Sequence, residues 1–224
     1  MYVPAEVYQL AAMRPKQKIH YLSADHQRAM PLPANVTYLS VPQAGIIPFP
    51  YPAASFSHIR ASTLPSLVPS SRLPQIFKEC RRLLVPGGVL EIRIMDASPV
   101  RRTAGPQMRT WIEDRVSLNL ERLFRCSKPC LLVPNWIADA GFELLGGSGI
   151  GQMMRMPCAH SNNGSVDEEL SALVGRALWK DIWGSFVSDE PGQARWWWED
   201  EGIIEECLDR KTVFECGVLF AIRR

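Results

Sequence analysis

The chain has 224 residues, of which 46% are hydrophobic and 21% are charged. This is ordinary globular usage and fits one domain, or one domain with an elaboration. The net charge of +2 is too small to indicate a nucleic-acid or membrane surface, and no apolar run reaches the roughly 18 residues of a membrane span. No secretory signal pattern opens the sequence, and the six cysteines form no C-x2-C pair. We therefore expect reduced core cysteines, no metal site and a cytoplasmic location.

The first half of the sequence alternates strand and helix patterns. In chain order, the expected elements are a helix at 4–13, strands at 18–25, 35–41 and 55–62, a helix at 73–84 and a strand at 89–95. Gly87 and Gly88 end the second helix and turn the chain into the strand that follows. This alternation is typical of a parallel sheet with helices on both faces.

The second half is richer in helix patterns. The expected helices run from Gly105-Pro106 onward, from 133 to a stop at Gly141, from Ser165 onward and at 195–208. Strands are expected near 142–156 and, closing the chain, at 212–222. Ser165 and Glu168 form a capping box. The helix that they start carries one apolar side, made of Leu170, Leu173, Val174, Ala177, Leu178 and Ile182. We expect the closing strand to lie antiparallel at one edge of the sheet, and the whole chain, 1–224, to form a single domain with a Rossmann-like part at 1–150 and C-terminal helices and a strand at 151–224.

A set of short motifs resembles a known family. They are Gln43-Ala44, Ile47-Pro48-Phe49-Pro50, Ser55-Phe56-Ser57, Val85-Pro86-Gly87-Gly88 and Ala140-Gly141-Phe142. With this order and spacing, residues 18–145 resemble the class I S-adenosylmethionine-dependent methyltransferases, in particular the small-molecule enzymes of fungal secondary metabolism. The resemblance implies an α/β fold with a Rossmann-like methyltransferase sheet, mostly parallel with an antiparallel edge strand. It says much less about activity.

The sequence departs from the family pattern where the family binds its cofactor. The family's first strand ends in a G-x-G loop, whereas the first glycine here is Gly45, so we expect the usual first strand and glycine-rich loop to be missing. Asp25 or Ser23 falls near the family's ribose-binding acid, and Gln43 replaces the acid before Ala44 in the adenine loop. These losses should remove most of the affinity for S-adenosylmethionine. We expect no cofactor; if S-adenosylmethionine is bound, Asp25, Gln43 and Ala44 are the candidate residues.

The missing strand is central in the family fold, and its loss would leave backbone groups of its neighbours unpaired. Strands 18–25 and 55–62 could pair directly, the N-terminus could supply a stub, or a second copy or partner chain could fill the gap. We favour oligomerisation. The sequence could also be an incomplete gene product.

Several polar residues are candidates for chemistry at the carboxyl ends of the strands, where doubly wound sheets bind ligands. His58 is the first choice as general base because histidine titrates near neutrality, and Arg60 lies on the same strand face. Asp96, which follows the strand at 89–95, is the second choice, and Ser62 would line the pocket. Each could equally be an ordinary solvated or core side chain.

Aromatic residues suggest a hydrophobic pocket. Trp111 and Trp136 are candidate core or pocket-wall residues. Arg101, in a basic segment at 101–109, could meet a carboxylate or enolate of the substrate or lie on a solvated face. The three tryptophans at 196–198 point about 100° apart on a helix. They therefore cannot all face one core, and two of them are expected to pack against the closing strand.

Three functions remain open. The first is a methyltransferase-like enzyme that no longer uses S-adenosylmethionine and catalyses a cyclisation, isomerisation or related rearrangement of a hydrophobic small molecule. The second is a genuine small-molecule methyltransferase, active as an oligomer. The third is a non-catalytic regulatory partner of a methyltransferase. We favour the first narrowly, and expect no nucleic-acid or membrane partner.

Overall fold

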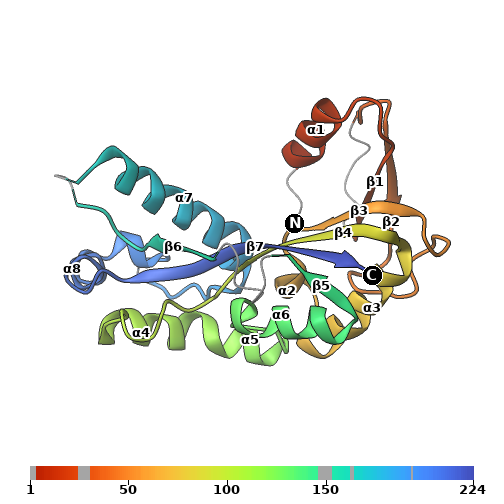
Figure 1. Cartoon of the computed structure of the whole chain (residues 1–224). Helices are drawn as coiled ribbons and strands as arrows, with labels where there is room; N and C mark the ends of the chain where they lie inside the picture. Colours follow the sequence, from red (N-terminus) through yellow and green to blue (C-terminus); the bar gives the residue numbers. More distant parts are fainter. Residues whose placement is uncertain (1–3, 25–30, 146–152, 162–163, 193) are drawn as a thin grey trace. The chain divides into compact units, whose positions relative to one another are not determined.

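The computed structural model describes residues 4–24, 31–145, 153–161, 164–192 and 194–224. They fall into two compact units, Met1–Pro50 and Tyr51–Arg224, which are treated separately below (Figure 1). The interpretation of the chain as one domain stays a prediction. Strands from both sides of residue 150 share one sheet. None of the helices in the described ranges has the length and hydrophobicity of a membrane span.

The first unit contains helix α1 (Pro4–Met13) and strands β1 (Ile19–Ser23) and β2 (Val36–Ser40). The two strands pair in parallel, with Ile19 opposite Val36 and Ser23 opposite Ser40, so the strands predicted at 18–25 and 35–41 are confirmed apart from their ends. The side-chain nitrogen of Asn35 lies within 3.1–3.3 Å of three carbonyl oxygens, that of Ala11 near the end of α1 and those of Arg14 and Gln17 in the segment that joins α1 to β1. Asn35 therefore fixes the start of β2 to that segment.

The second unit is built on a five-stranded mixed sheet. Its strands are β3 (Phe56–Ala61), β4 (Leu84–Met95), β5 (Phe142–Leu144), β6 (Met153–Pro157) and β7 (Val213–Arg223). The order is β3-β4-β7-β5, and β6 also pairs with β7. The β3–β4 pair is parallel, and β7 is antiparallel to β4, β5 and β6. The predicted α/β fold with a mixed sheet is confirmed.

The closing strand β7 differs from the prediction in its position. It is antiparallel, as expected, but it lies inside the sheet: β4 pairs along one side, and β5 and β6 pair along parts of the other. Burial on both sides explains its composition. Phe214, Cys216, Leu219 and Ala221 are all buried, in a strand with few polar side chains.

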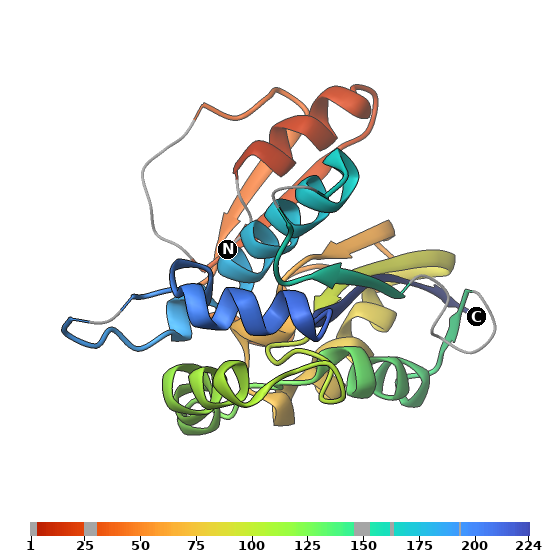
Figure 2. The ribbon, with the colours of Figure 1, turned by 90° about the vertical axis from the view of Figure 1, so that its left-hand side faces the viewer.

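Helices cover both faces of this sheet, as predicted. They are α2 (Leu64–Leu67), α3 (Leu73–Leu83), α4 (Pro106–Ile112), α5 (Leu118–Arg122), α6 (Pro129–Asp139), α7 (Val166–Trp183) and α8 (Glu201–Asp209). A π-helical turn, η2 (Glu113–Ser117), joins α4 to α5, and short 3-10 turns are η1 (Ser70–Arg72), η3 (Gly184–Phe186) and η4 (Trp197–Glu199). Helices α3 to α6 lie on one side of the sheet and α7 on the other (Figures 1 and 2).

Two predicted helices have different bounds. The helix expected from 133 to a stop at Gly141 is α6, which begins earlier, at Pro129, and carries Pro134 inside it; the strand start expected after Gly141 is β5. The helix expected at 195–208 is divided, because the Asp200 side chain accepts a hydrogen bond from Ile203 N at 3.1 Å and begins α8 anew. The preceding residues form the turn η4, so the three adjacent tryptophans do not lie on one α-helix.

The predicted capping box of α7 is confirmed, with Ser165 as its N-cap. The side of the helix that carries the predicted apolar residues is almost completely buried only at Ile182. Leu170, Leu173 and Val174 are exposed, whereas Trp179 and Trp183 are fully buried. Their indole nitrogens donate to carbonyl oxygens, Trp179 Nε1 to Ala97 at 3.0 Å and Trp183 Nε1 to Met95 at 3.2 Å. These two large side chains, whose indole N–H groups have acceptors, bury more area than the predicted leucines would, and they therefore set the orientation of the helix.

An aromatic core forms where α4, α7, η4 and β7 meet. The Trp179 and Trp197 rings lie 4.6 Å apart, and Trp197 lies 5.3 Å from Phe214 on β7. Trp197 is therefore packed against the closing strand, as expected. Trp196 and Trp198 instead stack on each other, with ring centroids 5.1 Å apart.

Candidate functional site

A buried carboxylate on the central strand is the centre of the best-defined polar cluster in the second unit. The parallel register of β3 and β4 places Glu91 opposite Arg60. Arg60 Nε donates to one carboxylate oxygen at 2.8 Å, and His58 Nε2 lies 3.2 Å from the other. Arg93 Nε lies 3.6 Å from the carboxylate. We call these four residues the Glu91 cluster.

Strand alternation explains why the cluster forms. Leu90, Ile92 and Ile94 are buried on one face of β4, so Glu91 and Arg93 point to the opposite face. His58 and Arg60 are likewise two residues apart on β3. The register then brings the polar faces of the two strands side by side.

The electrostatics of the cluster suit proton transfer. Glu91 is only 7% exposed, and a buried carboxylate is stable only when it is paired; the two guanidiniums provide that pairing. The His58 side chain is 51% exposed. One ring nitrogen faces Glu91, which orients the imidazole, and the other remains available for a proton. The arrangement can therefore act as an oriented general base or acid.

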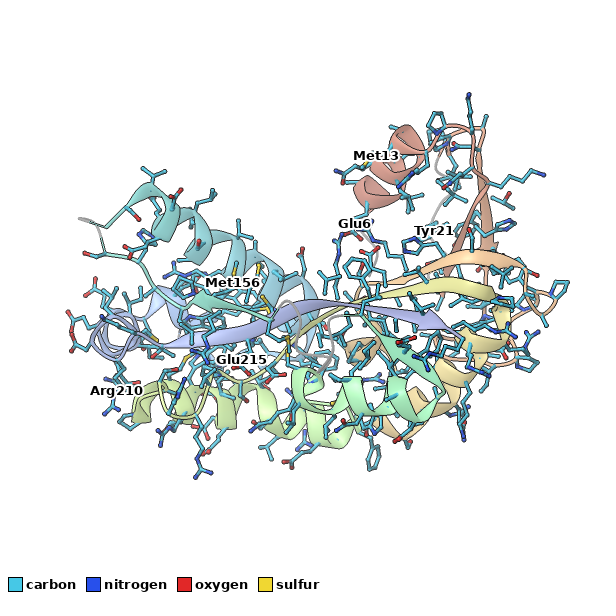
Figure 3. The ribbon with its side chains drawn as sticks, in the orientation of Figure 1. Glu6, Met13, Tyr21, Met156, Arg210 and Glu215 are labelled. Carbon is cyan, nitrogen blue, oxygen red and sulfur yellow. The ribbon has the colours of Figure 1, made fainter. Side chains whose placement is uncertain are left out.

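Asp96 lies apart from the cluster. It follows β4 five residues after Glu91, about 16 Å along the strand, and on the opposite strand face. Its carboxylate accepts from Cys130 N at the start of α6 at 2.9 Å, and its own N–H donates to the carbonyl of Glu215 on β7 (Figure 3). Burial raises the pKa of Asp96 to about 6, against the opposing effect of the Cys130 hydrogen bond. The structure thus brings His58 and Arg60 together and holds Asp96 as a cap of α6.

The predicted pocket residues are dispersed. Ser62 is buried just beyond β3. Trp111 belongs to the aromatic core, with its ring 5.4 Å from Trp197. Trp136 is half-buried on α6, and Arg101 is exposed. Among the described residues, no hydrogen bond, ion pair or ring contact joins the last three side chains to Glu91.

The residues predicted for a cofactor belong to the first unit. Because β1 and β2 are parallel, their carboxyl ends lie at the same edge. Gln43 is exposed and Ala44 is half-buried in the segment that follows β2, while Ser23 ends β1. Asp25 lies outside the described residues. Within those residues, no group of three or more histidine, cysteine or acidic side chains is placed to hold a metal ion.

A cavity of about 280 Å³ lies between α4 and α8. It is lined by Gln107, Gly202, Glu205, Glu206, Asp209 and Arg210. Arg210 directly follows α8 (Figure 3). The Glu206 carboxylate already accepts from Gln107 N at 3.0 Å and Met108 N at 2.9 Å. This carboxylate therefore caps the N-terminus of α4.

Glu91 and Arg93 were not among the site residues predicted from the sequence. Their signal was present in the segment VLEIRIM, where two charged residues alternate with apolar ones inside a strand between longer apolar stretches. A charge at that position in a buried strand requires a partner from a neighbouring strand. The predicted neighbour at 55–62 carries His58 and Arg60 at matching spacing.

Comparisons with known proteins find similar solved structures at low identity. A [4+2]-cyclase, SpnF, shares 16% identity over 98% of this chain and 62% of its own, with a TM-score of 0.40. A putative sarcosine dimethylglycine methyltransferase from Galdieria sulphuraria shares 15% over 96% and 75%, with a TM-score of 0.47. A geranyl diphosphate methyltransferase in complex with SAM shares 13% over 96% and 73%, with a TM-score of 0.46. No protein-family model and no curated protein matches the sequence.

This chain spans less than two thirds of the length of the cyclase. Methyltransferases and a cyclase are similar to it at comparable values. At these identities and TM-scores the similarities assign no activity, and the functional argument rests on this chain's own residues.

Proposed function

We propose that this chain is an enzyme that moves a proton within a hydrophobic small molecule and promotes its isomerisation or cyclisation without S-adenosylmethionine. The observation that carries the proposal is the Glu91 cluster: a half-exposed imidazole held by a buried, arginine-paired carboxylate. A carboxylate that fixes a histidine in this way favours general acid–base catalysis.

In the proposed reaction, the outer ring nitrogen of His58 takes a proton from a C–H or O–H bond of the substrate. Glu91 stabilises the imidazolium that forms, and Arg60 holds the Glu91 carboxylate in place through the 2.8 Å hydrogen bond. The imidazolium returns the proton to a different atom of the same molecule, so the composition of the substrate is unchanged. Neither an oxidant nor a methyl donor enters the balance.

Independence from S-adenosylmethionine is part of the proposal. Residues 1–44 contain no glycine, so these residues offer no loop with the glycine-dependent close approach that the methyltransferase resemblance implies. Gln43 supplies a neutral amide where the family has an acid. A neutral acceptor binds more weakly than a charged one.

Deuterium exchange tests the proton transfer without knowledge of the natural product. The chain is incubated in D₂O with a panel of enolisable phenols and polyketide-like ketones, and deuterium uptake is followed by mass spectrometry. We expect uptake in at least one compound, with His58→Ala reducing the rate at least tenfold and Glu91→Gln reducing it less. His20→Ala is the matched control, because His20 is an exposed strand histidine of the first unit. Unchanged uptake in His58→Ala, or none with the unsubstituted chain, would overturn the proposal.

A second function, small-molecule methyl transfer as an oligomer, is favoured by one observation. Gln43 and Ala44 follow the carboxyl end of a parallel strand, the edge at which doubly wound sheets bind ligands. Calorimetry with S-adenosylmethionine and its demethylated product decides between the two. Binding at about 10 µM or tighter, weakened by Gln43→Ala, would favour the methyltransferase and contradict the cofactor-independent reaction.

A further inference from the structure

Two of the six free cysteines meet in the interior of the second unit. Cys158 follows β6, and its N–H donates to the carbonyl of Thr212 at 2.9 Å; the N–H of Thr212 in turn donates to the carbonyl of Cys207 on α8 at 2.9 Å. The two thiols are themselves hydrogen-bonded. Both residues are almost completely buried. Three segments, the end of β6, α8 and the start of β7, therefore converge on one pair of sulfur atoms.

A positive charge accompanies this pair. Arg176 on α7 donates from Nε to the carbonyl of Cys158 at 3.0 Å, and its guanidinium acts electrostatically on both thiols. The hydrogen bond from Cys158, followed by that from Thr212, lowers the pKa of Cys207. Burial instead raises the pKa of Cys80 to about 12 and that of Cys126 to about 11. Cys158 and Cys207 thus form a pair of buried thiols that share a hydrogen bond beside a guanidinium.

Two other cysteines, Cys130 on α6 and Cys216 on β7, are arranged differently. Cys130 Sγ donates to the carbonyl of Glu215 at 3.4 Å, so this thiol is directed to backbone oxygen. Burial raises the pKa of Cys130, and that of Cys216. These two cysteines provide an internal comparison for the Cys158–Cys207 pair.

We propose that Cys158 and Cys207 form an oxidisable dithiol that closes to a disulfide in the presence of a peroxide. The Cys207 thiolate attacks one oxygen of hydrogen peroxide; the hydroxide that leaves takes up a proton and becomes water. The resulting sulfenic acid is attacked by the Cys158 sulfur, and its hydroxyl leaves with the Cys158 proton as a second water. Two thiols lose two electrons and two protons in total, and one peroxide is reduced to two waters.

The bridge would tie the end of β6 to α8. Because a cross-link between distant residues restricts the unfolded chain, the oxidised protein should unfold at a temperature several degrees higher than the reduced protein. Reduction with dithiothreitol should reverse the change. The proposal is independent of the reaction assigned to the Glu91 cluster.

Peptide mapping of the whole chain tests it. The reduced protein is treated with hydrogen peroxide, blocked with N-ethylmaleimide, unfolded and digested. We expect loss of two of the six free thiols and a peptide that joins Cys158 to Cys207. Cys207→Ser should keep the other five thiols reduced, whereas Cys80→Ala and Cys216→Ala should still form the bridge.

Two results would overturn the proposal. One is retention of all six thiols in the folded chain at peroxide levels that oxidise an exposed thiol peptide. The other is oxidation of Cys207 to a sulfinic acid, or to a bridge with another cysteine, while Cys158 stays reduced. Mapping of the unsubstituted chain decides the question by itself if a serine variant fails to fold.

Discussion

At the residue scale, two carboxylates differ in their partners: Glu91 within β4 and Asp96 directly after it. Glu91 is paired with two arginines and a histidine, as a buried carboxylate requires. Asp96 has the backbone N–H of Cys130 as its hydrogen-bond donor, and burial raises its pKa to about 6. The first carboxylate is suited to orient a catalytic group, whereas the second makes folding depend on pH.

Asp96→Asn should change the pH dependence of stability. Because the pKa of Asp96 is higher in the folded state than its ordinary value of 3.8, its contribution to stability is fully present below about pH 4 and is lost as the pH rises through 6. Asparagine keeps an oxygen for Cys130 N and does not ionise. Urea unfolding should show the parent losing about 2 kcal/mol relative to the variant between pH 4 and 7. Asp114→Asn, at an exposed position, is the control: its unfolding free energy should differ from that of the parent by the same amount at pH 4 and pH 7. The same constant difference in Asp96→Asn would contradict this account.

Two core tryptophans offer a matched comparison of hydrogen bonding. Trp179 Nε1 donates to the carbonyl of Ala97, whereas Trp197 Nε1 is buried without a partner among the described residues. Replacing either by phenylalanine removes a similar volume. Trp179→Phe should therefore cost about 1 kcal/mol more in the free energy of unfolding than Trp197→Phe, since it leaves the Ala97 carbonyl without this donor. Chemical denaturation of both variants measures the difference, and equal costs would show that Trp197 Nε1 is satisfied in solution.

At the scale of elements, a side chain of α8 caps the N-terminus of α4. The Glu206 carboxylate on α8 accepts the N–H groups of Gln107 and Met108 at the start of α4. Gly105 leaves the space for it, because an added Cβ would lie 2.0 Å from Glu206 Cδ. The glycine and the glutamate therefore form one structural feature across two helices.

A double-mutant cycle tests this cap. Gly105→Ala should displace the carboxylate and cost about 1–3 kcal/mol of unfolding free energy, and Glu206→Ala should cost a similar amount through the lost hydrogen bonds. In the double variant the second change should add little, because the cap is already absent. Additive costs in urea titrations would show that Gly105 acts through its own backbone and not through Glu206.

Helices and strands were predictable from the sequence where neighbouring residues alone determine them, and less so where contacts with distant segments decide. The capping box at Ser165 predicted the start of α7 correctly because a cap depends on neighbouring residues alone. The buried side of that helix was not predictable from its leucines, because Trp179 and Trp183 reach carbonyl partners on distant segments. Similarly, β4 begins at Leu84, earlier than predicted, because Phe56 pairs with Leu84. The turn expected at Gly87 and Gly88 is an irregularity within this strand, where the register with β3 shifts and Gly87 has a φ of +77°.

The candidate site was predictable in part for the same reason. Strand spacing was sufficient to place His58 and Arg60 on one face, but their partner on β4 depends on the inter-strand register. Register is set by long-range pairing, which a single sequence does not specify. Asp96 was grouped with them because all three are near strand ends, and the distance along β4 separates it.

At the scale of the whole molecule, the chain consists of two compact units, each with its own sheet. In the first unit, the side-chain nitrogen of Asn35 links β2 to the end of α1 and to the residues that follow it. An amide has two N–H donors, so it satisfies two of the three nearby carbonyls at a time. In the second unit, the aromatic core joins helices to β7, and β7 in turn pairs with β4.

Asn35→Ala should therefore loosen the first unit more than the second. Loss of two hydrogen bonds at about 1 kcal/mol each should raise amide hydrogen exchange in α1, β1 and β2 about tenfold or more, because each 1.4 kcal/mol is a factor of ten in the opening equilibrium. Exchange in β4 and β7 should change much less. Hydrogen exchange with mass spectrometry measures both regions in one sample, and Thr37→Ala, at an exposed position of β2, is the control. An equal increase in both sheets would mean that the two units open as one cooperative structure.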